Sequence, residues 1–447
     1  MKFRLNNPAW LQAAGQAGKA NSLFYITSNA DDNELTFENT KLGIWADNIQ
    51  YRTDGAQTWE QLTDDLALTL NEGETVYFRN YTGNVYNSAM STKVVNVADI
   101  YSIGGDITKL FYPGVKLPAD AFQFAFMEDI NLLDASDLIL KSTELAVDCY
   151  RSMFQSCEGL TSAPALPATA LANNCYTYMF RGCTSLTSAP ALPATELAER
   201  CYYAMFSFCS DLISAPALPA TALTNECYSH MFQSCTSLTS APSLPATELA
   251  DNCYHSMFLN CEGLTSAPAL PATALANNCY MEMFSGCTNL TSAPALPATT
   301  LANNCYYAMF SFCTSLTSAP TLPATVLADD CYHSMFKNCT SLISAPALPA
   351  ITLASSCYGA MFASCTSLTS APALPATALP NSCYYHMFND CTGLTSVTCL
   401  ATIITHEEAT DGWLENVAAE GTFTKAADAE WPEGASGIPE GWTVIEQ

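Results

Sequence analysis

The chain has 447 residues, 49% of them hydrophobic and only 13% charged, and this composition excludes a disordered chain. Acidic residues outnumber basic ones by 42 to 15, and the net charge of −27 repels nucleic-acid phosphates and anionic lipid surfaces. No apolar run approaches the roughly 20 residues of a membrane helix. We therefore expect neither a nucleic-acid partner nor membrane insertion.

The N-terminal part is predicted to be rich in β-structure. Residues 1–19, which include Trp10 and Leu11, are either an attachment arm or a frayed terminus, and no apolar segment typical of a secretory signal is visible there. Residues 20–112 contain short β-favouring runs, such as Leu23–Ile26 and Val94–Val97, separated by turn residues. This pattern predicts a β-sandwich-like domain, and the N-terminal region is a candidate for joining copies into a homo-oligomer.

Cysteines mark a long internal repeat. Ten of them, from Cys149 to Cys383, follow one another every 26 residues, and ten more, from Cys157 to Cys391, lie eight residues behind them. The unit reads Cys-Tyr-x-x-Met-Phe-x-x-Cys-x-x-Leu-Thr-Ser-Ala-Pro-Ala-Leu-Pro-Ala-Thr. A period between about 20 and 50 residues predicts a solenoid. We place it over 113–402, with a degenerate first layer at 121 that lacks both cysteines.

Each unit is predicted to hold one short helix. Leu171, Cys175, Met179 and Cys183 are spaced by four residues and form an apolar stripe, so the segment from Cys175 to about Gly182 is predicted as helix. Polar pairs precede the first cysteine and are typical of helix caps. These pairs include Asn173-Asn174, Asp251-Asn252, Asp329-Asp330 and Ser355-Ser356.

A short extended segment, Thr-Ser-Ala-Pro-Ala-Leu-Pro, follows the second cysteine. Its prolines, such as Pro190 and Pro193, forbid helix and leave only a few residues able to pair as a strand. The expected fold is therefore an α/β solenoid of leucine-rich-repeat-like type, with parallel strands on one face and short helices on the other. A β-rich N-terminal domain and a small C-terminal cap complete it.

The cysteines are predicted to be free, buried thiols. On a helix, Cys175 and Cys183 would be about 12 Å apart, and helices of neighbouring layers about 8 to 10 Å apart, so neither pairing suits a disulfide. Zinc is disfavoured because the cysteines form two separated rows instead of a convergent set. We expect no metal and no other cofactor.

Four of the five histidines occupy the two positions between Cys-Tyr and Met-Phe, which are predicted to point away from the core. With successive helices about 10 Å apart and no recurring carboxylate beside them, they are interpreted as exposed surface histidines. The chain also lacks a glycine-rich phosphate loop, a Gly-x-Ser-x-Gly elbow and a His-Glu-x-x-His helix. We therefore predict that the protein is not an enzyme.

The same two positions vary from repeat to repeat, whereas the proline segment is nearly constant. Tyr, His and Ser side chains give apolar area with hydrogen-bonding tips, which suits partner contact, although unselected surface drift would also explain the variation. The candidate contact residues are Tyr178, Tyr203, His230, His255, Tyr307, His333, Tyr385 and His386.

The last segment, 403–447, is acidic and rich in Gly and Pro. It also contains Trp413, Trp431 and Trp442. Since an open solenoid end needs a cover, this segment is predicted to be a small C-terminal cap.

The motif Met-Phe-x-x-Cys-x-x-Leu occurs ten times, and nine of these copies are followed by Ala-Pro-x-Leu-Pro-Ala. Over about 121–402 the chain resembles the BspA-like leucine-rich repeats of Bacteroidales and their phages. This resemblance implies adhesion or recognition at a cell or virion surface, with a protein or glycan partner, and not catalysis.

Reduced cysteines and the lack of a visible export signal favour a phage virion fibre or other host-contact protein assembled in the host cytoplasm. A bacterial adhesin, at the cell surface or secreted, is the first alternative. A structural spacer without a ligand is the second.

Overall fold

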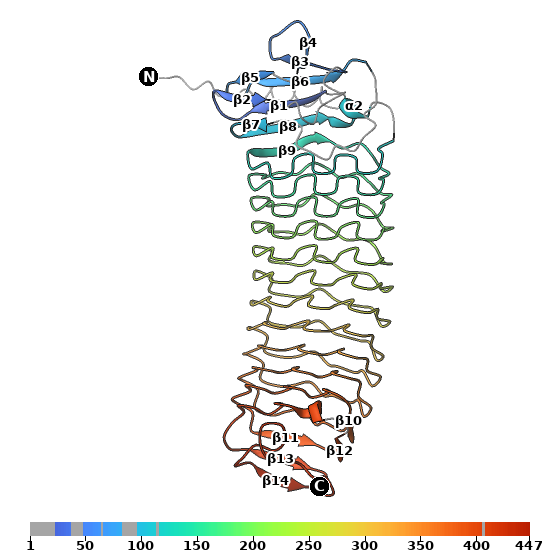
Figure 1. Ribbon diagram of the computed structural model, residues 1–447, viewed down its shortest axis with the longest axis vertical. Coiled ribbons are helices and arrows are strands. Elements are labelled where there is room, and N and C mark those ends of the chain that lie inside the picture. Colours follow the sequence, from blue (N-terminus) through green and yellow to red (C-terminus); the bar gives the residue numbers. More distant parts are fainter. Residues whose placement is uncertain (1–22, 37–47, 64–65, 83–95, 113–115, 405–406) are drawn as a thin grey trace, which may run out of the picture.

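A computed structural model describes the chain except for residues 1–22, 37–47, 64–65, 83–95, 113–115 and 405–406. The described residues form an elongated stack, with an N-terminal sheet at one end, regular layers in the middle and a short parallel sheet at the other end (Figure 1). The predicted arm at 1–19 lies outside the described residues. Homo-oligomer formation through that region stays a prediction.

Antiparallel sheets make up the N-terminal region. Its strands are β1 (Phe24–Ser28), β2 (Asn33–Thr36), β3 (Ile49–Thr53), β4 (Glu60–Gln61), β5 (Ala67–Leu70), β6 (Thr75–Asn80), β7 (Asn96–Val97) and β8 (Tyr101–Asp106). One sheet has the order β4-β3-β6-β1-β8 and the other β5-β2-β7. Phe24 and Ile26 are buried and Tyr25 between them is half-buried, because successive side chains of a strand point to opposite faces. The boundaries of the four predicted domains stay predictions.

The N-terminal sheet is hydrogen-bonded to the stack. Strand β9 (Leu132–Ile139) pairs in parallel with β8, and its residue Asp134 bridges to Ser162 in the next layer. In the sequence, α2 (Ile107–Phe111) follows β8 and precedes β9. It is the one α-helix among the described residues. The first layer has no cysteine, yet its Phe122 stacks on Tyr150 with ring centroids 5.8 Å apart. The side-chain ladders of the solenoid thus begin in this layer.

The prediction of a helix in each repeat is wrong. The segment is a ribbon of overlapping β-turns, in which N–H groups alternate between two kinds of acceptor. The Gln233 N–H donates to His230 O within the same layer at 3.1 Å, whereas the Phe232 N–H donates to Met257 O of the next layer at 2.9 Å. A helix satisfies its N–H groups internally, but this ribbon uses half of them to hold neighbouring layers together.

A left-handed residue at every fourth position creates this ribbon. In one layer Glu226, His230 and Ser234 have φ values of +54°, +56° and +58°, and the corresponding residues of the other repeats do the same. A right-handed helix cannot include such residues. The polar pairs interpreted as helix caps serve the ribbon: Asn252 has a φ of +58°, and the Asp251 carboxylate accepts the Asn277 N–H of the next layer at 2.9 Å.

The proline segments pair less than the predicted strands would. Ser214 forms single parallel bridges with Ser188 and Ser240 in the adjacent layers, and between β9 and Ala378 no repeat in the described chain forms a longer strand. Pro190 and Pro193 have no N–H to donate, so the ladder cannot extend through them. The expected parallel sheet is therefore reduced to a row of isolated bridges.

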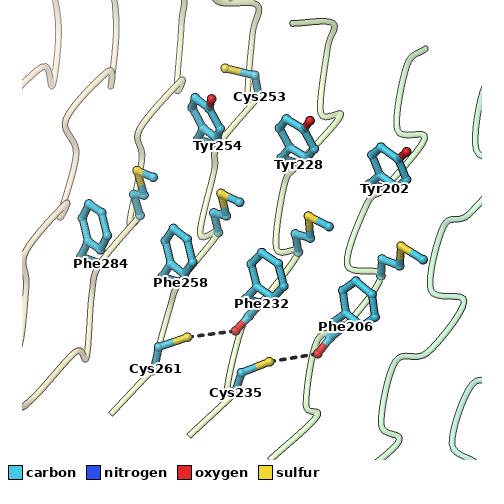
Figure 2. Close-up of a cluster of buried hydrophobic side chains, with 14 of the residues drawn as sticks. Tyr202, Phe206, Tyr228, Phe232, Cys235, Cys253, Tyr254, Phe258, Cys261 and Phe284 are labelled. Atoms are coloured by element: carbon cyan, nitrogen blue, oxygen red, sulfur yellow. Dashed lines mark hydrogen bonds between the residues drawn. The ribbon is translucent and has the colours of Figure 1, made fainter. Parts of the chain in front are cut away.

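Side-chain ladders fill the interior, with one member from each layer. The Tyr228 ring stacks on Tyr202 and on Tyr254 with centroids 5.9 Å apart, and Phe232 stacks on Phe206 at 5.7 Å (Figure 2). The repeated Cys, Met and Phe side chains, and the Leu three residues after the second cysteine, are fully buried, whereas the Leu represented by Leu171 is partly buried. Each aromatic pair contributes about 0.5 to 1.5 kcal/mol beyond the burial of its area. The prediction of 26-residue layers around a shared interior is confirmed.

The stack ends in short parallel strands. They are β10 (Ala378–Leu379), β11 (Ser396–Cys399), β12 (Ile403–Ile404), β13 (Thr422–Lys425) and β14 (Thr443–Glu446), with the 3₁₀ turn η3 at Glu407–Thr410. Strands β11-β13-β14 form one sheet, and β10 pairs with β12. Trp413 stacks on Tyr384 at 6.0 Å, and Trp431 stacks on Trp413 at 5.3 Å. Two indoles thus continue the tyrosine ladder.

Candidate contact ridge

The two varied positions of each repeat lie on the turn ribbon, between the Tyr and Met ladders, and we call their side chains the ridge. The pairs are Arg151-Ser152, Thr177-Tyr178, Tyr203-Ala204, Ser229-His230, His255-Ser256, Met281-Glu282, Tyr307-Ala308, His333-Ser334, Gly359-Ala360 and Tyr385-His386. The second residue of every pair is left-handed, with φ between +48° and +59°. In most pairs a large side chain stands beside a small one, and the small ones, such as Ala204 and Ser256, are buried.

Four of the predicted contact residues form a continuous row over four successive layers. The ring centroids of Tyr178 and Tyr203 are 5.4 Å apart, those of Tyr203 and His230 are 5.4 Å apart, and those of His230 and His255 are 4.7 Å apart. The predicted spacing of about 10 Å between successive helices was wrong because the repeats contain no packed helices. Hydrogen-bonded layers lie closer, so ridge side chains touch from one layer to the next.

The other four predicted residues form two separate pairs. Tyr307 stacks on His333 with centroids 5.0 Å apart, and Tyr385 meets His386 edge to face at 4.2 Å. A Cβ at Gly359 would lie only 2.6 Å from the His333 ring, so the glycine of the following layer makes room for the imidazole. Part of the variation along the ridge is therefore set by packing between layers.

The interpretation of the histidines as exposed is also wrong. The side chains of His255 and His333 are only 24% and 21% exposed, since each lies against neighbouring layers. Carboxylates do lie near them: the His255 Nε2 is 3.9 Å from Glu282, and the His333 Nδ1 is 3.5 Å from Asp330. Both distances exceed those of a strong hydrogen bond.

Burial dominates the titration of these imidazoles. It lowers the pKa of His255 to about 4, with a further contribution from neighbouring His230, and it also lowers the pKa values of His230 and His333. At neutral pH these rings are therefore uncharged. A neutral imidazole has one hydrogen-bond donor and one acceptor, and the Nδ1 of His230 is already paired with Gln233 at 3.0 Å.

Two arginines that were not predicted as contact residues belong to the ridge surface. The Arg181 guanidinium lies 5.7 Å from the Tyr178 ring, and the Arg200 guanidinium lies 4.5 Å from the Tyr203 ring. Arg200 also approaches Glu226, with Nε 3.4 Å from the carboxylate. Each arginine stands three residues from its tyrosine, a spacing that one turn of the ribbon brings together. The surface thus combines aromatic faces, cations and neutral imidazoles.

The cysteines are buried and free, as predicted. The distance argument against a bridge between layers does not hold, because neighbouring layers lie closer than packed helices. The second-series thiols are instead held by hydrogen bonds: Cys235 donates to Phe206 O at 3.1 Å and Cys261 to Phe232 O at 3.0 Å (Figure 2). Burial raises the pKa of Cys261 to about 12. Such protonated thiols act as small apolar groups with a weak donor.

Comparison with known proteins finds a distant structural neighbour. No family model and no curated protein matches the chain. Among solved structures, a chain of the crystal structure of a TLR13–ssRNA13 complex is 12% identical with a TM-score of 0.25, over 72% of this chain and 48% of the other. This chain thus spans about half the length of that neighbour, and the low TM-score supports no conclusion about fold or function.

Two features are absent from the described residues. None of their helices is long and apolar enough to cross a membrane. They contain no group of three or more His, Cys, Asp or Glu side chains arranged to hold a metal ion.

Proposed function

We propose that the protein is a non-enzymatic recognition protein and that the ridge is its main contact surface. The observation that carries this proposal is the row from Tyr178 to His255, where varied aromatic and imidazole side chains adjoin across four otherwise uniform layers. Tyr and His present apolar area with polar tips at low entropy cost. Arg181 and Arg200 add cations over the same rings.

The partner in this proposal is a protein or glycan on a cell surface. Leucine-rich-repeat character, and the likeness of the repeat motif to BspA-like proteins, support this choice. We place the protein in a phage virion, as a fibre or other host-contact protein, because its buried thiols suit assembly in a reducing cytoplasm. A bacterial surface adhesin is the alternative.

Binding to cells tests the proposal. The full chain, fluorescently labelled, is titrated onto a panel of Bacteroidales cells and onto a glycan array. Replacing Tyr203 and Tyr307 together by Ser removes two half-buried ridge rings, and we expect the apparent affinity to fall at least about tenfold. The matched control replaces Ile213 and Ile343, which are exposed at the start of proline segments, by Ser.

Unchanged binding by the ridge variant would refute the ridge as the contact surface. Binding to no cell and no glycan would instead favour the structural spacer. For the placement, antibodies against the chain should label purified phage particles. Labelling of intact bacteria without phage would support the adhesin.

A further inference from the structure

The C-terminal cap contains a cavity whose shape depends on glycines. Residues 432–438 fold back so that Glu433 bridges to Ile438, and the Gly434 N–H donates to Ile438 O at 2.8 Å. Gly434 has a φ of +105°, and a Cβ at Gly437 would lie 1.9 Å from Pro432 O. These backbone positions favour glycine strongly. The fold-back brings Glu433 close to the segment that continues to Glu440.

The cavity has a volume of about 300 Å³, and the indoles of Trp431 and Trp442 are among its walls. Both walls are anchored: Trp431 stacks on Trp413 at 5.3 Å, and Trp442 donates from its indole nitrogen to Ala418 O at 2.8 Å. Trp413 in turn donates to Gly437 O at 2.9 Å and ties the loop to the stack. The aromatic walls are therefore positioned before any ligand arrives.

The charge of the cavity is negative. Lys425 lines it but is paired with Glu446 at 2.8 Å and donates to Ala429 O at 2.9 Å. Glu433 and Glu440 also line it, and in the described structure neither carboxylate has an ion-pair or hydrogen-bond partner. Both carboxylates are exposed to solvent, which screens their charge, but beside indole rings in a chain of net charge −27 they favour a cation over an anion.

Two other cavities in the described chain lack this chemistry. One of about 290 Å³ lies between proline segments and is lined by Pro320, Pro323, Pro346 and neighbouring Ala, Thr and Leu residues, without a charged group. An equivalent cavity four repeats earlier, around Pro219 and Pro242, is likewise uncharged. Only the cap cavity combines aromatic walls with unpaired charge among these three.

From this geometry we infer that the cap cavity binds a cationic side chain, arginine or lysine, of a partner protein. The alkyl stem packs on the indoles of Trp431 and Trp442, and the guanidinium or ammonium group donates hydrogen bonds to Glu433 and Glu440. Arginine fits best, because its planar guanidinium both stacks on indole and bonds carboxylates in a bidentate manner. This contact site is separate from the ridge and does not depend on the ridge binding anything.

The test titrates the full chain with N-acetyl-arginine amide, with N-acetyl-lysine amide and with uncharged glucose, and follows tryptophan fluorescence at low salt. We expect saturable quenching by arginine amide, weaker quenching by lysine amide and none by glucose. The double variant Glu433→Gln, Glu440→Gln should weaken arginine-amide binding at least about tenfold. The matched control, Glu420→Gln with Glu430→Gln, removes the same charge from equally exposed residues that do not line the cavity and should bind as the wild type does.

Equal thermal unfolding temperatures of the two double variants show that any difference in binding comes from the cavity. Absence of arginine-amide binding in the wild type would overturn the inference. So would unchanged binding in the Glu433→Gln, Glu440→Gln variant, or quenching by glucose in place of the cations. A loss of cell binding in the ridge variant with cation binding retained would show that the two proposals stand separately.

Discussion

The two sides of each layer are built on different principles although they belong to one 26-residue unit. On the ribbon side, every second N–H donates to the next layer, as the Phe232 N–H does to Met257 O. On the proline side, only some adjacent layers share isolated bridges, such as that between Ser188 and Ser214. The comparison teaches that the ribbon, together with the ladders beneath it, holds the stack, and that the proline segment mainly closes the coil.

Alkaline pH should have the largest effect on stability, because it ionises the cysteines on the ribbon side. All cysteines are buried, and burial raises the pKa of Cys209, Cys261 and Cys339 to about 12, from 9.0 in the unfolded chain. Below pH 9 both states keep the proton, so the stability is fully present. Above pH 9 the unfolded state releases protons that the folded state keeps. Each such thiol then lowers the free energy of unfolding by about 1.4 kcal/mol per pH unit, up to about pH 12.

Because the repeats contain twenty buried cysteines, cooperative unfolding is expected within about one to two units above pH 9. Tryptophan fluorescence during thermal unfolding in reductant, at pH values from 8 to 11, measures this. An unfolding temperature unchanged up to pH 11 would contradict it.

Removal of one ladder member should have the next largest effect. Phe258→Ala deletes a fully buried ring that stacks on Phe232 and Phe284 and leaves a cavity, so the stability should fall by about 3 to 5 kcal/mol. In a stack of nearest-neighbour contacts this also uncouples the layers on either side. Denaturant unfolding measures the loss. The comparison variant Ile351→Ala, at a side chain 71% exposed, should change stability by less than about 0.5 kcal/mol.

Acid should lower the stability of the fold by a smaller amount, through the ridge histidines. The pKa of His255 is about 4 in the fold and 6.5 in the unfolded chain, so its neutral form is favoured in the folded state. The stability is fully present above pH 6.5 and is lost as the pH falls toward 4, by up to about 3 kcal/mol. His255→Gln should therefore lose less stability than the wild type between pH 6.5 and 4.5. If the stability of the two proteins fell in parallel with pH, this expectation would be contradicted.

The smallest expected effect is a gain in stability. Phe312 occupies a left-handed position of the ribbon, with a φ of +61°, and its side chain is 50% exposed. Asn tolerates this conformation better than Phe, and repeats such as that of Asn260 already use it. Phe312→Asn should raise the stability by about 1 kcal/mol, seen as a higher unfolding temperature. A lower temperature would show that the exposed ring contributes more than the strain costs.

Much of the architecture could be predicted from the period of the cysteines. That period identified the layers, their buried side chains and the free thiols. The helix was mispredicted because a spacing of four residues resembles the helical 3.6 over a short segment, although Leu171, Cys175, Met179 and Cys183 would drift by about 40° per step around a helix. Residues that tolerate left-handed backbone, such as Asn174 and Gly182, recur eight residues apart in several repeats and are the sequence signal of the ribbon, although the left-handed position between them holds Tyr178.

The candidate site was predicted only in part. The sequence identifies the ridge positions, but the contacts between Tyr203, His230 and His255 depend on the short distance between hydrogen-bonded layers. The cap cavity was not predicted at all. It arises where the backbone folds back between Glu433 and Ile438, and no periodic pattern indicates such a loop.

Amide hydrogen exchange at residue resolution tests the turn ribbon most directly. In the middle layers, the amides of Tyr254 and Phe258, which donate to the next layer, should exchange only through global unfolding, whereas those of Thr265 and Ser266 in the proline segment should exchange much faster. Equal protection on both sides of the layer, or faster exchange from the ribbon, would contradict the account.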